Sequence, residues 1–308
     1  MAHPVEQIAQ CLAAPDIVVN MRVPASGILL ALFTVGSAGA EDLYFDSAGV
    51  RLRYIVEGKG EPVVLIHGFG ANIEVGWRET GIVDGLADRY QVIAMDVRGH
   101  GRSDKPRTPV AYGLPMVEDV VRLMDQLRIQ KAHVVGYSMG GRIATMLLAE
   151  RPERLRTAVI GGAGWMDADG LRARRIRMEQ TAQALEQGKG VEPLIAWLAP
   201  PSAEPPTPQQ VEAFNRIFLS RNDPVALAAV ARGIASLQPP QSKLRVNKTP
   251  VLALVGELDP NQSEVDRLER ITPNLKVVVI AGAHHLNAVR NPEFLNNVKA
   301  FLAAHRDR

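Results

Sequence analysis

The most reactive candidate in this sequence is a serine enclosed by two glycines. Residues 136–140 read Gly-Tyr-Ser-Met-Gly, with Ser138 at the centre. A strand-like segment, 131–135, precedes the serine, and a helix-forming segment, 142–150, follows it. A serine between a strand and a helix sits on a sharp turn that exposes its hydroxyl, and the flanking glycines suit a turn without room for side chains. The bare pattern also occurs in glycine-rich loops, but this context predicts a nucleophile.

A serine hydroxyl is a weak nucleophile, so a base must take its proton and a third group must hold that base. The sequence has seven histidines, and two adjacent ones, His284 and His285, follow the apolar run 275–280. That run predicts a buried parallel strand. A histidine just past the end of such a strand can reach a serine at the end of another strand, so this pair supplies the candidate bases.

The acid is expected between the serine and the histidines in the chain. Asp259 lies in the loop after the apolar segment 251–255, which predicts a strand. The order Ser138, Asp259, histidine matches the chain order of one hydrolase class. Glu257 and Asp167 are rival acids, because the first lies two residues earlier and the second follows the preceding strand.

Several motifs together resemble the α/β-hydrolase fold superfamily, and more closely a serine esterase or lipase-like member with a helical cap. The similarity runs from about residue 44 to about residue 301. The family usually has Gly-Ala-Gly-His at its last motif, whereas His284 occupies the third position here. The resemblance therefore implies that His285 is the base and that His284 replaces a glycine. The motifs are His67-Gly68-Phe69-Gly70, residues 96–103, residues 136–140, Gly256-Glu257-Leu258-Asp259 and Gly282-Ala283-His284-His285.

The same resemblance implies an oxyanion hole made of backbone N–H groups. Acyl transfer develops negative charge on the carbonyl oxygen, and fixed N–H donors stabilise it. One donor is expected from Met139, directly after the nucleophile, and the other from Phe69, in the loop after the strand 63–66. His67 is expected to brace this loop. The loop 96–103 is expected to be structural, with its arginines paired to nearby acids.

The remaining chain predicts an α/β fold with a mostly parallel central sheet and helices on both faces. An antiparallel hairpin is expected to open the fold within 43–56. About 90 residues separate the strands expected at 157–161 and 251–255, too many for a loop, so a helical cap is expected after the sixth strand. The expected division is a core of 41–163 and 246–308 and a cap of 164–245. Within the cap, helices are expected at 171–187, 209–221 and 223–237, with a stiff, extended connector at 199–208.

The cap should cover the carboxyl ends of the strands, where ligands bind in open α/β sheets. It should therefore influence substrate choice. Trp165 and Met166, just after a strand end, are expected to bind substrate, and apolar cap residues are further candidates. The alternative for each of these residues is that it only holds the cap to the core. The apolar candidates are Leu194, Trp197 and Leu198.

Composition excludes several function classes. The 308 residues are 46% hydrophobic and 22% charged, which is ordinary for one globular α/β domain with an insertion. The net charge is only +2 and no basic run is present, so nucleic acid is not an expected partner. No His, Cys, Asp or Glu cluster has metal-ligand spacing and no cofactor fingerprint is present, so neither a metal nor a cofactor is expected. The oligomeric state is not defined by these features.

The N-terminal segment 21–40 has a basic start, an apolar centre and a small-residue end, which is typical of a secretory signal. The apolar run is too short for a stable membrane span. Residues 1–20 do not fit such a signal, so translation is expected to start at Met21 and cleavage to follow Ala40. The mature protein is then expected in the periplasm or outside the cell. The alternatives are a packed N-terminal helix and an uncleaved anchor.

These features predict an enzyme that hydrolyses small-molecule carboxylic esters through an acyl-enzyme. Hydrolysis of carbon–carbon bonds in meta-cleavage products and cofactor-free peracid formation use the same triad and are the alternatives. Relatives with an aspartate nucleophile are disfavoured by the serine at position 138. A non-enzymatic binding protein on this scaffold is disfavoured, because it has less reason to keep nucleophile, base, acid and oxyanion turn together.

Overall fold

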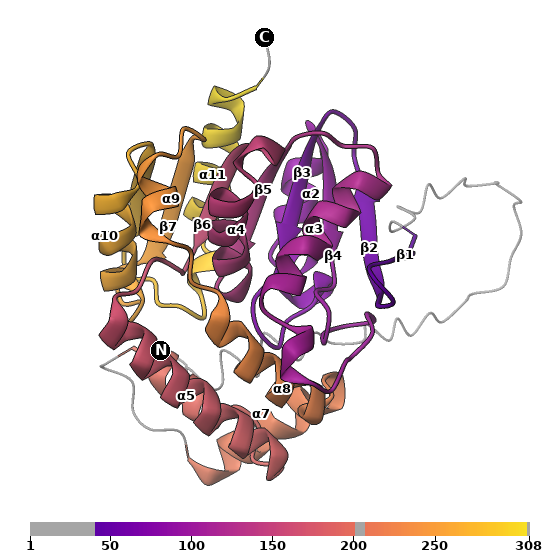
Figure 1. Ribbon diagram of the computed structural model, residues 1–308. Helices are drawn as coiled ribbons and strands as arrows, with labels where there is room; N and C mark the ends of the chain where they lie inside the picture. The colour runs from indigo at the N-terminus through magenta and orange to yellow at the C-terminus, as the bar shows by residue number, and fades with distance from the viewer. Residues whose placement is uncertain (1–40, 201–206, 307–308) are drawn as a thin grey trace, which may run out of the picture.

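The computed structural model describes residues 41–200 and 207–306. The expected signal at 21–40, and residues 201–206 of the expected connector, lie outside the described residues. The described chain forms a central sheet flanked by helices, with a group of further helices at one end (Figure 1).

The sheet has eight strands in the order β1-β2-β4-β3-β5-β6-β7-β8. The β1–β2 and β2–β4 pairs are antiparallel, and every other neighbouring pair is parallel. The opening hairpin and the mostly parallel sheet are therefore confirmed. The strands are β1 (Leu43–Asp46), β2 (Arg51–Glu57), β3 (Glu61–Ile66), β4 (Tyr90–Met95), β5 (Ala132–Tyr137), β6 (Leu155–Gly161), β7 (Val251–Gly256) and β8 (Leu275–Ile280).

Helices cover both faces of the sheet because successive strand residues point to opposite sides. Val63 and Leu65 of β3 pack on the face covered by α2 and α11, whereas Val64 and Ile66 pack on the face of α3 and α4. Both faces are apolar, as expected for a parallel sheet buried on both sides. The core helices are α2 (Ile82–Ala87), α3 (Leu114–Gln126), α4 (Met139–Glu150), α10 (Gln262–Ile271) and α11 (Pro292–Ala304).

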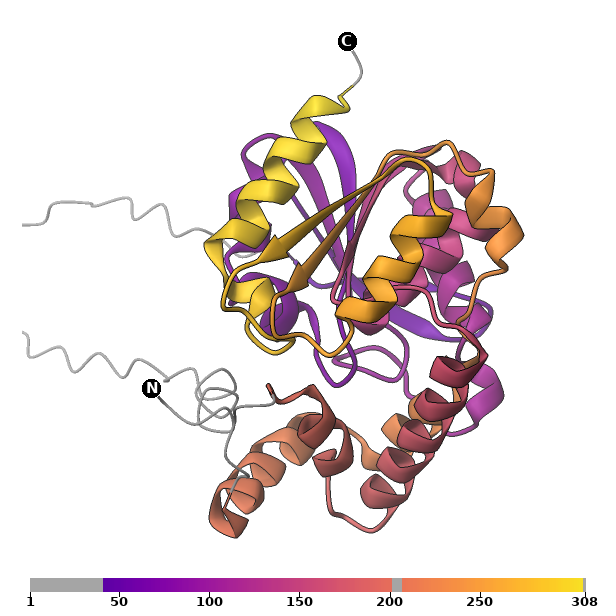
Figure 2. The same cartoon turned by 90° about the vertical axis from the view of Figure 1, so that its left-hand side faces the viewer.

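A helical insertion follows the sixth strand, as the sequence predicted. Figure 2 shows most of this insertion below the sheet, at the end toward which β7 and β8 point, whereas α9 lies beside the core in Figure 1. The short helices α6 and α9 were not predicted, because each is too short for a clear periodic pattern. Helix α9 packs against α4 and α10 of the core. The helices between β6 and β7 are α5 (Ala168–Glu186), α6 (Glu192–Leu198), α7 (Pro208–Arg221), α8 (Pro224–Gly233) and α9 (Gln241–Arg245).

The last strand corrects one expectation. β8 lies where the apolar run predicted a strand, but most of its residues are partly or largely exposed, and Val279 is 45% exposed. The prediction of a buried strand was wrong because β8 is the edge of the described sheet, where its one strand partner is β7. An apolar run indicates a strand, but it does not reveal how many neighbours that strand has.

Candidate active site

Ser138 sits on a strained turn between β5 and α4. Its backbone adopts φ 55° and ψ −111°, a conformation that non-glycine residues rarely occupy. The flanking glycines are required by close backbone contacts. A Cβ at Gly136 would lie 2.1 Å from the carbonyl oxygen of Gly140, and a Cβ at Gly140 would lie 1.8 Å from that of Ile66. The turn thus holds the serine side chain at the carboxyl end of the sheet.

Three side chains from three strand ends form a continuous hydrogen-bonded chain. The Ser138 Oγ lies 2.9 Å from His285 Nε2, and His285 Nδ1 lies 2.8 Å from Asp259 Oδ2. Asp259 and His285 are each 3% exposed. A carboxylate only accepts, so Nδ1 carries the proton and Nε2 is left to accept from the serine hydroxyl. The structure therefore brings together the three residues that the sequence analysis selected.

His284 points its ring to a different environment. Its Nδ1 accepts a hydrogen bond from the Leu286 N–H at 3.3 Å, and it lines the cavity described below. Burial and the neighbouring His285 lower the pKa of His284. His284 therefore lies beside the hydrogen-bonded chain without joining it.

The two rival acids are engaged elsewhere. Glu257 accepts a hydrogen bond from the Gly282 N–H at 2.8 Å. Asp167 caps the N-terminus of α5 and forms an ion pair with Arg267 at 3.0 Å. Neither carboxylate contacts His285, so Asp259 alone of the three is placed to orient it.

The two expected oxyanion donors lie in the same cavity as Ser138. Met139 is the first residue of α4, so its N–H has no acceptor within the helix. Within residues 41–200 and 207–306, no backbone acceptor is seen for the N–H of Met139 or Phe69. The loop carrying Phe69 passes close to the serine, since a Cβ at Gly68 would lie 3.4 Å from the Ser138 Cβ. Both N–H groups are thus placed beside the serine.

His67 holds this loop in position. Its Nδ1 donates to the Gly68 carbonyl at 2.8 Å, and its Nε2 accepts from the Val97 N–H at 3.0 Å. Burial lowers the pKa of His67 to about 4, so the ring is neutral near pH 7 and keeps one donor and one acceptor.

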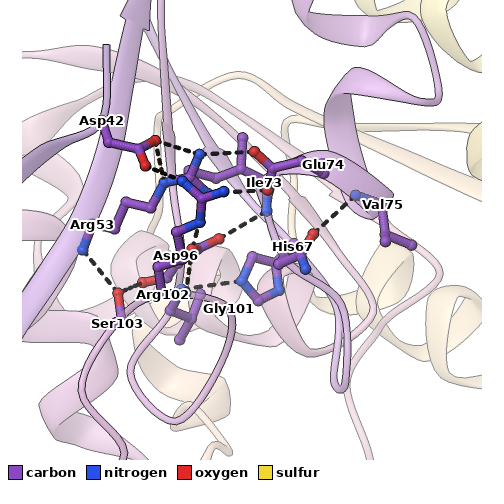
Figure 3. A network of polar contacts seen from close by, with 12 residues as sticks. Asp42, Arg53, His67, Ile73, Glu74, Val75, Asp96, Gly101, Arg102 and Ser103 are labelled. Carbon is purple, nitrogen blue, oxygen red and sulfur yellow. Dashed lines mark hydrogen bonds and ion pairs between the residues drawn. The ribbon is translucent and has the colours of Figure 1, made fainter. Parts of the chain in front are cut away.

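A partly buried ionic network lies next to His67 (Figure 3). Arg53 pairs with Asp42 at 2.6 Å, Glu74 at 2.7 Å and Asp96 at 3.1 Å. Asp96 also accepts from the backbone N–H groups of Ile73 and of Arg102, each at 2.8 Å. The network therefore joins β2, the segment after the Phe69 loop and the loop 96–103, which confirms a structural role for that last loop.

A cavity of about 240 Å³ lies between the cap and the hydrogen-bonded chain. Trp165 and Met166, expected to bind substrate, do not line it. The Trp165 indole donates to the Pro239 carbonyl at 3.1 Å, and Met166 is buried beside Arg142. Their position after a strand end did not reveal that both side chains turn away from the cavity. The apolar residues of the lining include Phe69, Leu194, Trp197, Leu198, Phe214 and Phe218.

The family model for the alpha/beta hydrolase fold matches residues 61–292. The chain belongs to the α/β-hydrolase fold family. The relatives found for this α/β-hydrolase include several proteins named as hydrolases of different substrates.

One relative is 2-(acetamidomethylene)succinate hydrolase from Mesorhizobium japonicum, which is 29% identical over 84% of this chain and 94% of that protein. A solved structure of a thermophilic esterase from Thermogutta terrifontis, with malate bound, matches with a TM-score of 0.70 at 27% identity, over 87% of this chain and 100% of that chain. The acetyltransferase component of the acetoin cleaving system of Cupriavidus necator is 41% identical over 42% of this chain, which spans only 36% of that protein.

This α/β-hydrolase also has site residues that the sequence analysis missed. Arg142, Arg174 and Arg177 all line the cavity. Arg142 lies four positions after the nucleophile, on α4. Residues four apart lie on the same face of a helix, so this spacing could have identified Arg142 as a site residue. The other two lie in an arginine-rich stretch of α5, which indicates only a solvated helix face.

Two further properties of the described part of this α/β-hydrolase concern possible metal ligands and helices that could span a membrane. Within residues 41–200 and 207–306, no three His, Cys, Asp or Glu side chains converge as possible metal ligands. In the same ranges, none of the helices is both long enough and apolar enough to cross a membrane.

Proposed function

We propose that this protein is a serine hydrolase that cleaves carboxylic esters through an acyl-enzyme. The observation that carries the proposal is the hydrogen-bonded chain from Ser138 through His285 to Asp259, which lies beside a cavity lined by many apolar side chains. Its two spacings of 2.9 Å and 2.8 Å are those that proton transfer requires. The chain is 27% identical to the thermophilic esterase of known structure, and this similarity supports ester hydrolysis as the reaction.

The proposed reaction follows from these contacts. The Ser138 Oγ attacks the ester carbonyl while His285 Nε2 takes its proton. The negative charge on the carbonyl oxygen is stabilised by the N–H groups of Phe69 and Met139. The carbon–oxygen bond then breaks, and His285 gives the proton to the leaving alcohol. Water attacks the acyl-enzyme by the same route, which releases the acid and restores the serine.

Replacement of the nucleophile tests the proposal. Ser138→Ala is expected to lower kcat for p-nitrophenyl esters by about 10⁶-fold, because the acyl-enzyme cannot form. Circular dichroism and thermal unfolding should show that the variant is folded. Activity within tenfold of the wild type would refute the assignment. Esters from acetyl to palmitoyl, assayed beside a meta-cleavage diketone, distinguish ester hydrolysis from carbon–carbon bond hydrolysis.

We also propose that the protein is exported and that its mature chain begins at Glu41. β1 begins at Leu43, and Asp42 is ion-paired with Arg53, so a chain that begins at Glu41 keeps this strand and this contact. Mass spectrometry of the protein from its native host tests the proposal. A soluble cytosolic protein that retains residues before Met21 would refute it.

A further inference from the structure

The charged side chains around the cavity carry one sign. Apart from Tyr137, His67, His284 and His285, the titratable side chains of the described lining are four arginines, and no Asp or Glu of the described chain lines the cavity. Arg290 is turned to Glu79 at 3.6 Å and to the Val75 carbonyl at 3.3 Å. The other three, Arg142, Arg174 and Arg177, come from α4 and α5 and lie near one another. They are called the arginine cluster here.

Arg174 is a buried cation without a described acidic partner. It is 4% exposed, and its guanidinium donates to the carbonyl oxygens of Ile234 at 2.6 Å and Leu237 at 3.3 Å. These contacts join α5 to the short helix η4 (Ile234–Ser236), but carbonyl groups do not neutralise the charge. Burial, together with repulsion from Arg142 and Arg177, lowers the pKa of Arg174. An anion beside the cluster would relieve this repulsion.

Arg177, one turn further along α5, has unused donors. Its guanidinium stacks on the Trp197 ring with its carbon 3.6 Å from the ring centroid. No hydrogen bond or ion pair to this guanidinium is seen in the described part of the chain. Stacking occupies a face of the planar group and leaves its in-plane N–H donors available to an acceptor. The nearby acid of the same helix, Glu179, is already paired with Arg232 at 3.0 Å.

Arg142 brings the positive charge close to the nucleophile. Its backbone N–H donates to the Ser138 carbonyl at 3.1 Å, so it lies one helical turn after the serine. Its guanidinium pairs with Glu264 at 2.8 Å. The same carboxylate raises the pKa of Arg174 and of Arg177, but burial outweighs it and lowers both values. The cavity lining therefore carries three guanidinium groups from α4 and α5, and only that of Arg142 is paired with a carboxylate among the described residues.

We propose that the arginine cluster binds a free carboxylate of the substrate, so that the natural substrates are half-esters of dicarboxylic acids or similar acidic esters. This inference rests on the proposed esterase function. The apolar lining would hold the carbon chain, Arg177 and its neighbours would bind the free carboxylate, and the ester carbonyl would then face Ser138. Attack by Ser138 then releases the alcohol, and water releases the dicarboxylate from the acyl-enzyme.

The proposed carboxylate site can be tested by comparing acidic esters with neutral esters of the same shape. Monoethyl esters of succinate, glutarate and adipate are compared with the corresponding ethyl ester amides, which have the same shape without the charge. The wild type should prefer the acid for at least one chain length, as measured by kcat/KM. Arg177→Gln should lower the acid-to-amide ratio by about 10- to 100-fold, chiefly through KM. Arg177→Lys should retain part of the preference because it keeps the charge.

Arg175→Gln is the matched control, because Arg175 is exposed on the same helix. It should leave the ratio at the wild-type value. A wild type that prefers the amide at every chain length would overturn the inference, and so would an Arg177→Gln variant with an unchanged ratio.

A binding measurement separates this inference from the proposed function. Ser138→Ala protein is titrated with glutarate and with glutaramide by calorimetry. Saturable glutarate binding that is weakened by Arg177→Gln supports the subsite. No glutarate binding, with neutral esters still hydrolysed by the wild type, would overturn the subsite alone. Glutarate binding without any ester turnover by the wild type would instead overturn the proposed function.

Discussion

The Tyr137 hydroxyl donates to the His285 carbonyl oxygen at 2.5 Å. The next residue, Ser138, contacts the ring of the same histidine through its hydroxyl. Two consecutive residues at the end of β5 therefore hold both the backbone and the imidazole of a residue that lies 147 positions from Ser138 in the sequence. This double contact fixes the position of His285 and leaves its neighbour His284 outside the hydrogen-bonded chain.

The two adjacent histidines should differ strongly when replaced. His285→Ala is expected to lower kcat for p-nitrophenyl esters nearly as much as loss of the serine, by about 10⁶-fold, because the two residues act as a unit. His284→Ala should change kcat by less than tenfold, since the one hydrogen bond seen for its ring in the described chain comes from the Leu286 N–H and not from Ser138 or Asp259. Steady-state assays of both variants check this. An inactive His284→Ala beside an active His285→Ala would reverse the assignment.

The acid can be tested with a matched pair of aspartates. Asp259→Asn should lower kcat by up to about 10⁴-fold, because the amide favours the wrong imidazole tautomer. Asp167→Asn should leave kcat near the wild-type value, since asparagine can also cap α5. The pH profile of kcat for each variant is the measurement. Equal losses in the two variants would contradict the role given to Asp259.

The ionic network centred on Arg53 should contribute strongly to stability. Arg53→Met leaves Asp96, which is fully buried, without its cationic partner. Removing one member of a buried ion pair typically costs about 3–5 kcal/mol in the free energy of unfolding. Arg102→Met is the control, because Arg102 is largely exposed and exposed pairs contribute at most about 1 kcal/mol. Urea unfolding should separate the variants, and equal losses would argue against the network.

Stability should fall below neutral pH because of buried histidines. Burial lowers the pKa of His67 and His133 to about 4 and that of His100 to about 3. The unfolded chain binds these protons from about pH 6.5 downward and the folded chain does not, so stability is present above pH 6.5 and is lost between about pH 6.5 and pH 4.

His133→Gln isolates one of these groups at a distance from the active site. It should reduce the slope of the unfolding free energy against pH by up to about 1.4 kcal/mol per pH unit, because one proton fewer is bound on unfolding. Urea midpoints at pH 7, 6 and 5 provide the slope. Parallel curves for wild type and variant would show that His133 does not titrate in this way.

Much of the fold and the catalytic chain was predictable because its signals are local. The glycines around Ser138 are required by contacts within the turn, and strands and helices alternate in the sequence as they do in the sheet. Asp259 and His285 each follow an apolar strand, and the carboxyl ends of parallel strands meet at one edge. The proximity of these residues in space therefore followed from the order of the elements.

The tertiary structure alone decided which side chains surround the cavity. The stretch 172–177 of α5 carries arginines around much of the helix, and only its packing against α6 and α8 turns Arg174 and Arg177 inward. Trp165 was misassigned for the same reason, since its backbone position did not define the direction of its side chain. Elements and motifs arise from local geometry and periodicity, whereas the lining of a cavity depends on how separate helices rotate and pack.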